Sequence, residues 1–317
     1  MTSNGSIPVS GKPNGLHASL TRSPALDDLL NVLQTHRACW IGAIMVLGLL
    51  VGSFLNVVIL RLPPRLAHGW RRDARETLGL PEEASIPEPP GIVHPPSRCP
   101  HCNHRLRPWE NIPLLSYLAL RGRCGHCRAP ISPRYPLVEA LTALLFAIVA
   151  WRFGVGIEAL GALTLTGLLI TLSIIDLDHQ LLPDDLTLPG MWLGLAFSLT
   201  GAFTDPATAL LGAMAGYLAL WSVYQAFRVL TGKEGMGYGD FKLLALLGAW
   251  LGWTRLPGVI LIGSLVGAMV GTVVLRVTGQ DRQTPIPFGP FLAAGGWIML
   301  VFGDQVNQGY LRLAGLA

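Results

Sequence analysis

The sequence predicts an all-α polytopic membrane protein of about eight transmembrane helices, with a cytoplasmic four-cysteine zinc-binding insert between the first two. Three observations favour this fold class. Of the 317 residues, 51% are hydrophobic and only 13% are charged, about half the charged fraction of an average soluble domain. Eight apolar runs approach or reach the length of about 20 residues that crosses a bilayer. One long polar block with two cysteine pairs interrupts them.

Four divisions follow along the chain. Residues 1–37 are rich in Gly, Ser and Pro without an apolar period, so we expect a disordered tail. The first apolar run starts too late for a secretory signal. Residues 38–60 form the first transmembrane helix, residues 61–134 the insert, and residues 135–317 the remaining spans. Those spans are expected near 136–152, 157–176, 186–203, 207–230, 240–254, 257–277 and 288–311, the sixth span of the chain being short.

The basic residues predict the orientation of the chain in the membrane. Cytoplasmic connections carry an excess of Lys and Arg, and the 61–134 block holds 12 arginines. We therefore place this block in the cytoplasm. Alternating spans then bring the connections 176–185 and 235–240 to the same cytoplasmic face, and both chain ends to the opposite one.

Two cysteine pairs in the insert predict a metal centre. They read CPHC and CGHC, and the pairs are 21 residues apart. Four thiolates in two such knuckles suit one tetrahedral Zn²⁺, although structural thiols without metal are the alternative. A site closed by four sulfurs leaves no position for substrate, so the zinc is expected to be structural. The predicted ligands are Cys99, Cys102, Cys124 and Cys127.

Six acids in or beside the spans are candidates for a functional role, because acids are costly there and usually functional. Glu139 has the character of an ordinary residue at the cytoplasmic end of a span. Asp184 and Asp185 precede an apolar run, and we expect one of them to act as an N-cap. Asp178 is expected to lie in or near water. The two remaining acids are Asp176 and Asp240.

Asp176 and Asp240 are the candidate catalytic pair. Asp176 ends an apolar run at the C-terminus of a helix, where the helix dipole disfavours an anion, so capping does not account for it. Asp240 opens an apolar run and could be a simple N-cap. The alternating Gly235, Gly237 and Gly239 before it favour a backbone past which another chain can lie, which makes Gly237 and Gly239 candidate substrate-binding residues. Two aspartates at one face indicate aspartyl hydrolysis, in which the pair shares one proton.

Several motifs together resemble the type IV prepilin peptidases, or leader peptidase/N-methyltransferases, of the GxGD aspartyl protease family. They are GSFLNVVILRLP, the two cysteine pairs, RYPLVEALTALLF, IDLDHQLLPDDLTLP, GMGYGDFKLLA and PIPFGPFLAAGG. The resemblance covers residues 40–300 in order. It implies that Asp176 and Asp240 are the catalytic aspartates, and that the protein lies in the bacterial inner membrane with its active site facing the cytoplasm.

The same resemblance implies the reactions and the partners. The family removes a short basic leader, after a glycine, from type IV prepilins or type II secretion pseudopilins. Many members then methylate the new N-terminal amine with S-adenosylmethionine, an activity associated with the cysteine-bearing block. The expected partners are these precursors and the lipid bilayer, with no nucleic acid.

Other functions remain open on the sequence alone. A protease-only GxGD enzyme would cut without methylating, and a zinc-containing membrane assembly factor would need the cysteines but neither aspartate. An intramembrane protease of the presenilin kind would share GxGD without the cysteine knuckles. A transporter would be expected to show broken helices at corresponding positions in two halves, and no such pair is evident.

Overall fold

The computed structural model describes residues 35–81, 87–233, 235–278 and 287–313, so nearly all of the expected N-terminal tail lies outside it. Within these ranges the protein is helical and has no named strand. The longer helices are α2 (Arg37–Thr77), α4 (Arg134–Phe153), α5 (Ile157–His179), α6 (Asp184–Ser198), α7 (Pro206–Thr231), α8 (Tyr238–Leu251), α9 (Leu256–Thr278) and α10 (Gly289–Leu313).

These eight helices occupy the eight apolar windows of the sequence. Five helical segments are long and apolar enough to cross a membrane: Arg37–Thr77, Arg134–Phe153, Ile157–His179, Pro206–Thr231 and Trp253–Val273. The all-α membrane architecture with an insert between the first two helices is therefore confirmed. The count of eight spans stays a prediction, since α6 and α8 have only 15 and 14 residues.

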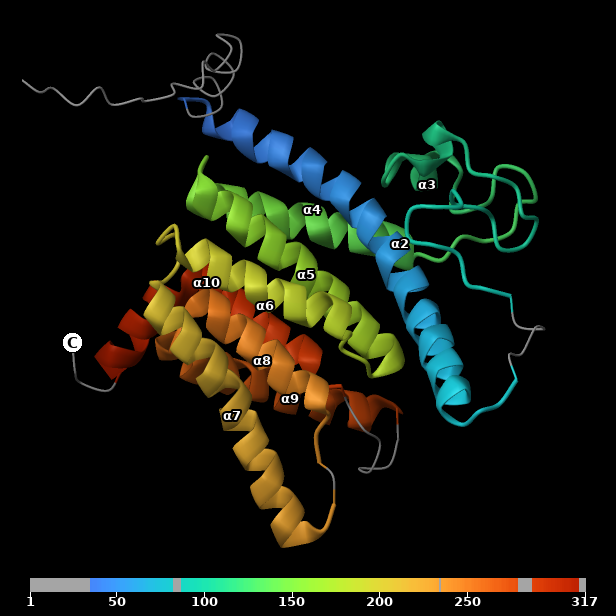
Figure 1. The fold of residues 1–317 in the computed structure, drawn as a ribbon. Helices are drawn as coiled ribbons and strands as arrows, with labels where there is room; N and C mark the ends of the chain where they lie inside the picture. The colour runs from blue at the N-terminus through green and yellow to red at the C-terminus, as the bar shows by residue number, and fades with distance from the viewer. Residues whose placement is uncertain (1–34, 82–86, 234, 279–286, 314–317) are drawn as a thin grey trace, which may run out of the picture.

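Helix α2 is longer than the apolar run that predicts it. The run ends at Leu60, but the helix continues for 17 more residues, through Pro63 and Pro64, to Thr77. The continuation is rich in Arg, Ala and Leu, which are good helix formers. Figure 1 shows this second half extending away from the other helices. The beginning of the polar insert is thus the end of a long helix.

Helices α2 and α4 pack closely through two glycines one helical turn apart. A Cβ atom at Gly48 would lie 2.7 Å from Cα of Ala143, and one at Gly52 would lie 2.8 Å from Cα of Glu139. Small residues at this spacing let two membrane helices approach to backbone contact. The contact fixes α2 beside the first turns of α4.

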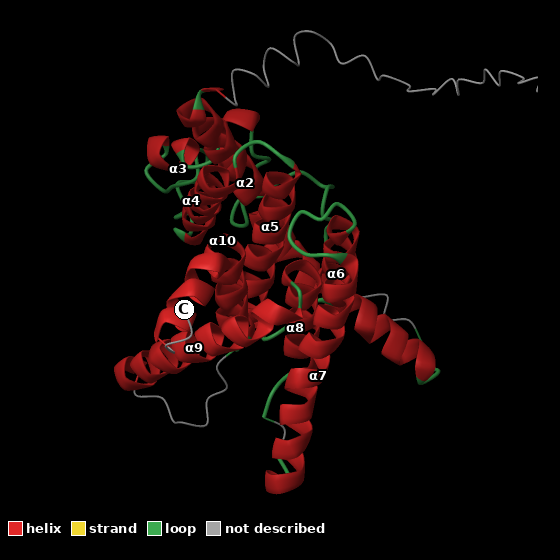
Figure 2. Ribbon diagram, turned by 90° about the vertical axis from the view of Figure 1, so that its left-hand side faces the viewer, coloured by secondary structure: helices red, strands yellow, loops and turns green. Residues whose placement is uncertain are grey.

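Helix α8 forms the centre of the second half of the protein. It packs against α6, α7, α9 and α10, and Figure 2 shows it among them. From Asp240 to Leu251 every side chain except that of Lys242 is buried, including Phe241 and Trp250. The Trp250 ring donates a hydrogen bond of 2.8 Å to the carbonyl oxygen of Gly190 in α6. The first residue of this buried stretch is one of the two candidate catalytic aspartates.

Between α2 and α4 the described part of the insert has little regular structure. It contains a 3₁₀ turn, Pro108–Asn111, and the short helix α3, Leu115–Ala119. Two isolated β-bridges, Arg98 with Arg105 and Arg123 with Pro130, close its two cysteine loops.

Candidate active site

Asp176 and Asp240 line one cavity of about 860 Å³. Asp176 lies in the last turn of α5 and Asp240 in the first turn of α8, and their exposed fractions are only 5% and 7%. The cavity is bounded by the α5–α6 connection, residues 235–237 and the first turn of α8, residues 287–288 before α10, and Leu66 and Trp70 of α2. The fold thus brings together two acids that are 64 positions apart in the sequence.

Asp176 is held by the N-terminus of a different helix. The backbone N–H of Gly289, the first residue of α10, donates a hydrogen bond of 3.1 Å to Oδ2 of Asp176. A helix N-terminus attracts an anion through its free N–H groups and its dipole. This contact offsets the unfavourable position of Asp176 near the C-terminus of its own helix, which runs on to His179.

Asp240 is not an N-cap. The N-cap of α8 is Gly237, and Asp240 is the third residue of the helix. Its backbone N–H donates to the carbonyl oxygen of Gly237 at 3.2 Å. The capping interpretation was therefore wrong, because the helix begins two residues earlier than the apolar run, and the carboxylate is buried in the cavity.

The glycines before Asp240 differ in what surrounds them. A Cβ at Gly239 would lie 2.8 Å from Cβ of Leu182, so this glycine permits close packing against the α5–α6 connection. A Cβ at Gly237 would meet only Oδ2 of Asp240, at 4.0 Å. Both glycines line the cavity. Gly237 borders open space next to a candidate catalytic carboxylate, while Gly239 is already in contact with the protein.

The other acids near the cavity have ordinary partners. Asp178 forms an ion pair with Arg134, at the boundary between the insert and α4. Asp184 accepts hydrogen bonds from Nζ of Lys242 on both carboxylate oxygens, at 2.6 and 2.7 Å. Asp184 is the first residue of α6 and the N-cap is Pro183, so the expected capping by Asp184 or Asp185 was also wrong. Asp184 instead ties the start of α6 to the first turn of α8.

The four predicted cysteine ligands converge in the insert. The Sγ atoms of Cys99, Cys102, Cys124 and Cys127 all lie within 4.8 Å of one another. Tetrahedral zinc with Zn–S bonds of about 2.3 Å would separate its sulfurs by about 3.8 Å, and the Sγ atoms of Cys99 and Cys127 are 3.8 Å apart. The cluster therefore has the size that a zinc ion needs.

The backbone of the two cysteine loops favours a thiolate at the first cysteine of each pair. In both loops the first cysteine N–H donates to the carbonyl five residues on, at 2.9 Å for Cys99 and 2.8 Å for Cys124. The N–H groups of Cys102 and His101 lower the pKa of the Cys99 thiol to about 7. Those of Cys127 and His126 lower the pKa of Cys124. Since zinc binds the thiolate form, these N–H groups prepare the site for metal.

The two loops have the same hydrogen-bond pattern, 25 residues apart. The sequence indicates this repeat only through its two C-x-x-C pairs. His104 and His126 stack on each other with ring centroids 5.0 Å apart, beside the cluster. They are not in the group that could hold the metal, which consists of the four cysteines.

Two features of these sites were missed from the sequence. Glu139 is buried, with 8% of its surface exposed, and accepts a hydrogen bond of 2.9 Å from the N–H of Leu114 in the insert. Gly289 contacts Asp176 across 113 positions. The motif PIPFGPFLAAGG was the available signal for Gly289, but no local pattern assigns it a partner.

Two family models match the chain. The bacterial peptidase A24 N-terminal domain matches residues 46–153, which include the four cysteines. The type IV leader peptidase family matches residues 163–272, which include Asp176 and Asp240. No solved structure matches the chain.

Curated relatives match over almost their whole length. A prepilin leader peptidase/N-methyltransferase of Pseudomonas aeruginosa is 54% identical over 290 residues, 90% of this chain and 99% of the relative. Proteins of the same name from Stutzerimonas stutzeri and Xanthomonas campestris pv. campestris are 55% and 54% identical, over 90% of this chain and 98% and 99% of their own lengths. The chain therefore belongs to the type IV leader peptidase family.

Proposed function

We propose that this protein is a membrane-embedded aspartic endopeptidase that removes the leader of prepilins or pseudopilins after a glycine and then methylates the new N-terminal amine. One observation carries the peptidase half of the proposal. Two buried carboxylates, Asp176 and Asp240, reach one cavity from α5 and α8, and no metal ligand set among the described residues lies there. Two neighbouring carboxylates in a shielded site are the arrangement that aspartyl hydrolysis uses.

The reaction needs one proton shared between the two acids. The ionised carboxylate takes a proton from a water molecule, whose oxygen attacks the scissile carbonyl carbon. The protonated carboxyl donates a hydrogen bond to the carbonyl oxygen and so stabilises the charge that develops there. Collapse of the tetrahedral species breaks the C–N bond, and the leaving amine takes up a proton from the pair. The two aspartates titrate as one unit, so neither is assigned as acid or base.

The Gly289 N–H orients this pair. Its hydrogen bond to Oδ2 of Asp176 fixes one carboxylate against the start of α10, and a fixed orientation is what proton transfer requires. The cavity wall also carries apolar residues, including Leu66, Trp70 and Met236. These suit the hydrophobic segment that follows the cleavage point in the proposed substrates.

The insert is the proposed site of methyl transfer. S-adenosylmethionine supplies an activated methyl group when bound, as the N-methyltransferase names of the relatives imply. The four cysteines can hold zinc, and a Cys₄ site folds the insert without contacting substrate.

The active site is proposed to face the cytoplasm, in the inner membrane. The ion pair between Arg134 and Asp178 joins the end of the arginine-rich insert to the end of α5 that carries Asp176. Both sites therefore lie at one end of the spanning helices. The excess of arginine at that end supports the proposed cytoplasmic position.

The test is cleavage of a prepilin by purified wild type, Asp176→Asn and Asp240→Asn. We expect each variant to lose at least about 10²-fold in rate, since acid–base groups contribute 10²–10⁴. Asp185→Asn is the matched control, because Asp185 lines the same cavity but is exposed and belongs to a different helix. Thermal unfolding reports folding in every variant. Normal cleavage by either folded asparagine variant would remove that residue from the pair and favour an assembly factor over a protease.

A further inference from the structure

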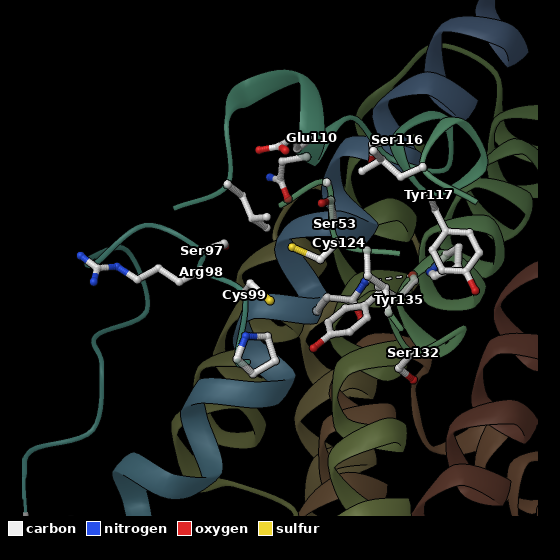
Figure 3. A pocket seen from close by; sticks show the side chains of 18 of the residues that line it. Ser53, Ser97, Arg98, Cys99, Glu110, Ser116, Tyr117, Cys124, Ser132 and Tyr135 are labelled. Carbon is white, nitrogen blue, oxygen red and sulfur yellow. Dashed lines mark hydrogen bonds between the residues drawn. The ribbon is translucent and has the colours of Figure 1, made fainter. Parts of the chain in front are cut away.

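A second cavity, of about 460 Å³, lies between the cysteine loops, the middle of α2 and the start of α4. Figure 3 shows Ser53 of α2, Cys99 and Cys124 of the two loops, and Tyr135 at the start of α4 around it. No described residue lines both this cavity and the one that holds Asp176 and Asp240. Its volume lies in the range of small-molecule sites, about 300–1,000 Å³.

One face of α2 forms a wall of this cavity. Its lining residues Ser53, Asn56, Val57, Leu60 and Arg61 recur at helical spacing. Asn56 is buried and donates a hydrogen bond of 3.1 Å to the carbonyl oxygen of Tyr135. The backbone contact of Gly52 with Glu139 holds this face against α4. The wall is therefore a built surface and not a gap between loosely packed loops.

Glu139 gives the cavity its chemical character. It lines the cavity, it is buried, and its Oε2 accepts from the N–H of Leu114. Within the described part of the chain no Arg, Lys or His forms an ion pair with it. Arg61, the basic residue of the α2 face, donates instead to the carbonyl oxygens of Gly91 and Pro95, each at 2.7 Å. A buried carboxylate without a cationic partner favours a ligand that carries positive charge.

The rings of Tyr117 and Tyr135 also line the cavity. Aromatic faces attract cations and stack on planar bases. Arg98, by contrast, points away from the other labelled side chains in Figure 3. The cavity thus combines two aromatic rings with a buried acid that has no cationic partner among the described residues, a pattern suited to a cationic nucleoside.

We infer that this cavity binds the S-adenosylmethionine of the proposed methyl transfer, and that the Glu139 carboxylate recognises its positive charge. The inference rests on the transferase half of the proposed function. In the transfer, the lone pair of the substrate's N-terminal amine forms the new N–C bond. The C–S bond breaks, its electron pair stays on sulfur, and the methylated amine releases a proton to water.

The place of the cavity suits a reaction that follows cleavage. Both cavities are lined by residues of α2. Arg61 lines this cavity and Leu66 lines the aspartate cavity, and the two residues are five positions, or about 7.5 Å, apart along the helix. In Figure 1 the insert and the helices that carry the aspartates lie on either side of α2. Helix α2 therefore contributes residues to both cavities.

The test compares binding of S-adenosylmethionine and S-adenosylhomocysteine to the full-length protein by calorimetry. The two ligands differ in the methyl group and the sulfonium charge. Glu139→Gln keeps an oxygen that can accept from Leu114 but removes the negative charge. We expect this substitution to weaken the binding of S-adenosylmethionine by about tenfold or more, and to weaken the binding of S-adenosylhomocysteine much less. Glu158→Gln, in the first turn of α5, is the control and should change neither affinity.

A second variant, Val57→Trp, fills the cavity from the α2 face and should abolish binding of both ligands. Zinc content and prepilin cleavage report folding in each variant. Suppose that the wild type methylates its substrate, but folded Glu139→Gln or Val57→Trp binds S-adenosylmethionine with unchanged affinity. That result would overturn the inference and leave the proposed function standing. A wild type that cleaves but neither binds the donor nor adds a methyl mass to the pilin would refute the transferase half of the proposed function, and the inference with it.

Discussion

The N–H of Gly289 donates a hydrogen bond to Oδ2 of Asp176 at 3.1 Å, so that the start of α10 fixes a carboxylate near the end of α5. Three segments of the chain, at 176, 240 and 289, are therefore needed to build one site. The position of Asp176 depends on a residue without a side chain. This dependence leads to the first prediction.

Gly289→Ala should slow prepilin cleavage by about ten- to a hundredfold. Its Cβ would lie 2.6 Å from Oδ2 of Asp176 and would force the carboxylate or α10 to move. A hydrogen bond to a charged group contributes about 1.5–3 kcal/mol, which sets the expected range. The measurement is kcat for one prepilin. Gly309→Ala, in the same helix with nothing within 4 Å, should cleave normally, and equal rates for both variants would contradict the proposed role of Gly289.

Valine at Gly237 and valine at Gly239 should have different effects. At Gly239 the new Cβ would press on Leu182, so we expect a lower unfolding temperature as well as lost cleavage. At Gly237 the space is open apart from the Asp240 carboxylate, so the protein should fold normally and lose cleavage because the substrate is obstructed. Thermal unfolding and cleavage are measured together. A folded Gly237→Val that cleaves at the wild-type rate would exclude Gly237 from substrate binding.

Cys124→Ser should remove zinc and methyl transfer but leave cleavage within about tenfold of wild type. The serine oxygen is a poor replacement for a thiolate ligand, and the metal folds the insert. No cysteine of the cluster lines the aspartate cavity. Metal content by mass spectrometry, methylation and cleavage are compared with those of Cys39→Ser, which should keep all three. If Cys124→Ser lost both its zinc and its cleavage activity, the aspartate site would depend on the insert.

The contact between Asp184 and Lys242 should contribute little to stability. Both side chains are partly exposed, at 52% and 31%, and exposed ion pairs are worth about 0–1 kcal/mol. A double-mutant cycle with Asp184→Asn and Lys242→Met, followed by denaturant unfolding, measures their coupling free energy. A coupling above about 2 kcal/mol would show that the pair is shielded from solvent in the folded membrane protein.

Much of the fold could be predicted because the membrane imposes a simple pattern. Apolar runs of the right length predicted the positions of the helices, and the spacing of the cysteine pairs predicted the cluster of four sulfurs. The end of α2 was harder to predict. The polar block that begins at Arg61 suggested a boundary, whereas the helix continues to Thr77 because the residues that follow are good helix formers.

The candidate site could be predicted only in part, for a physical reason. The dipole argument singled out Asp176, but it could not identify Gly289, because their contact joins residues 113 positions apart. The capping interpretation of Asp240 failed because α8 starts at Tyr238, before the apolar run. Glu139 was taken for an ordinary residue at the cytoplasmic end of a span, since nothing local shows that Leu114 of the insert would cover it.

The short length of α8 has a consequence for where the peptide bond is cut. Fourteen residues span about 21 Å, while the hydrocarbon layer is about 30 Å thick. Because the neighbouring helices shield α8 from lipid, its length does not have to match the membrane. If its far end reaches the opposite headgroups, the start of α8 lies about 9 Å below the near surface of the hydrocarbon, and Asp240, two residues further on, lies about 12 Å below it. A substrate could then be cut while its apolar segment stays at its normal depth, and the enzyme's task would be to bring water down to the bond.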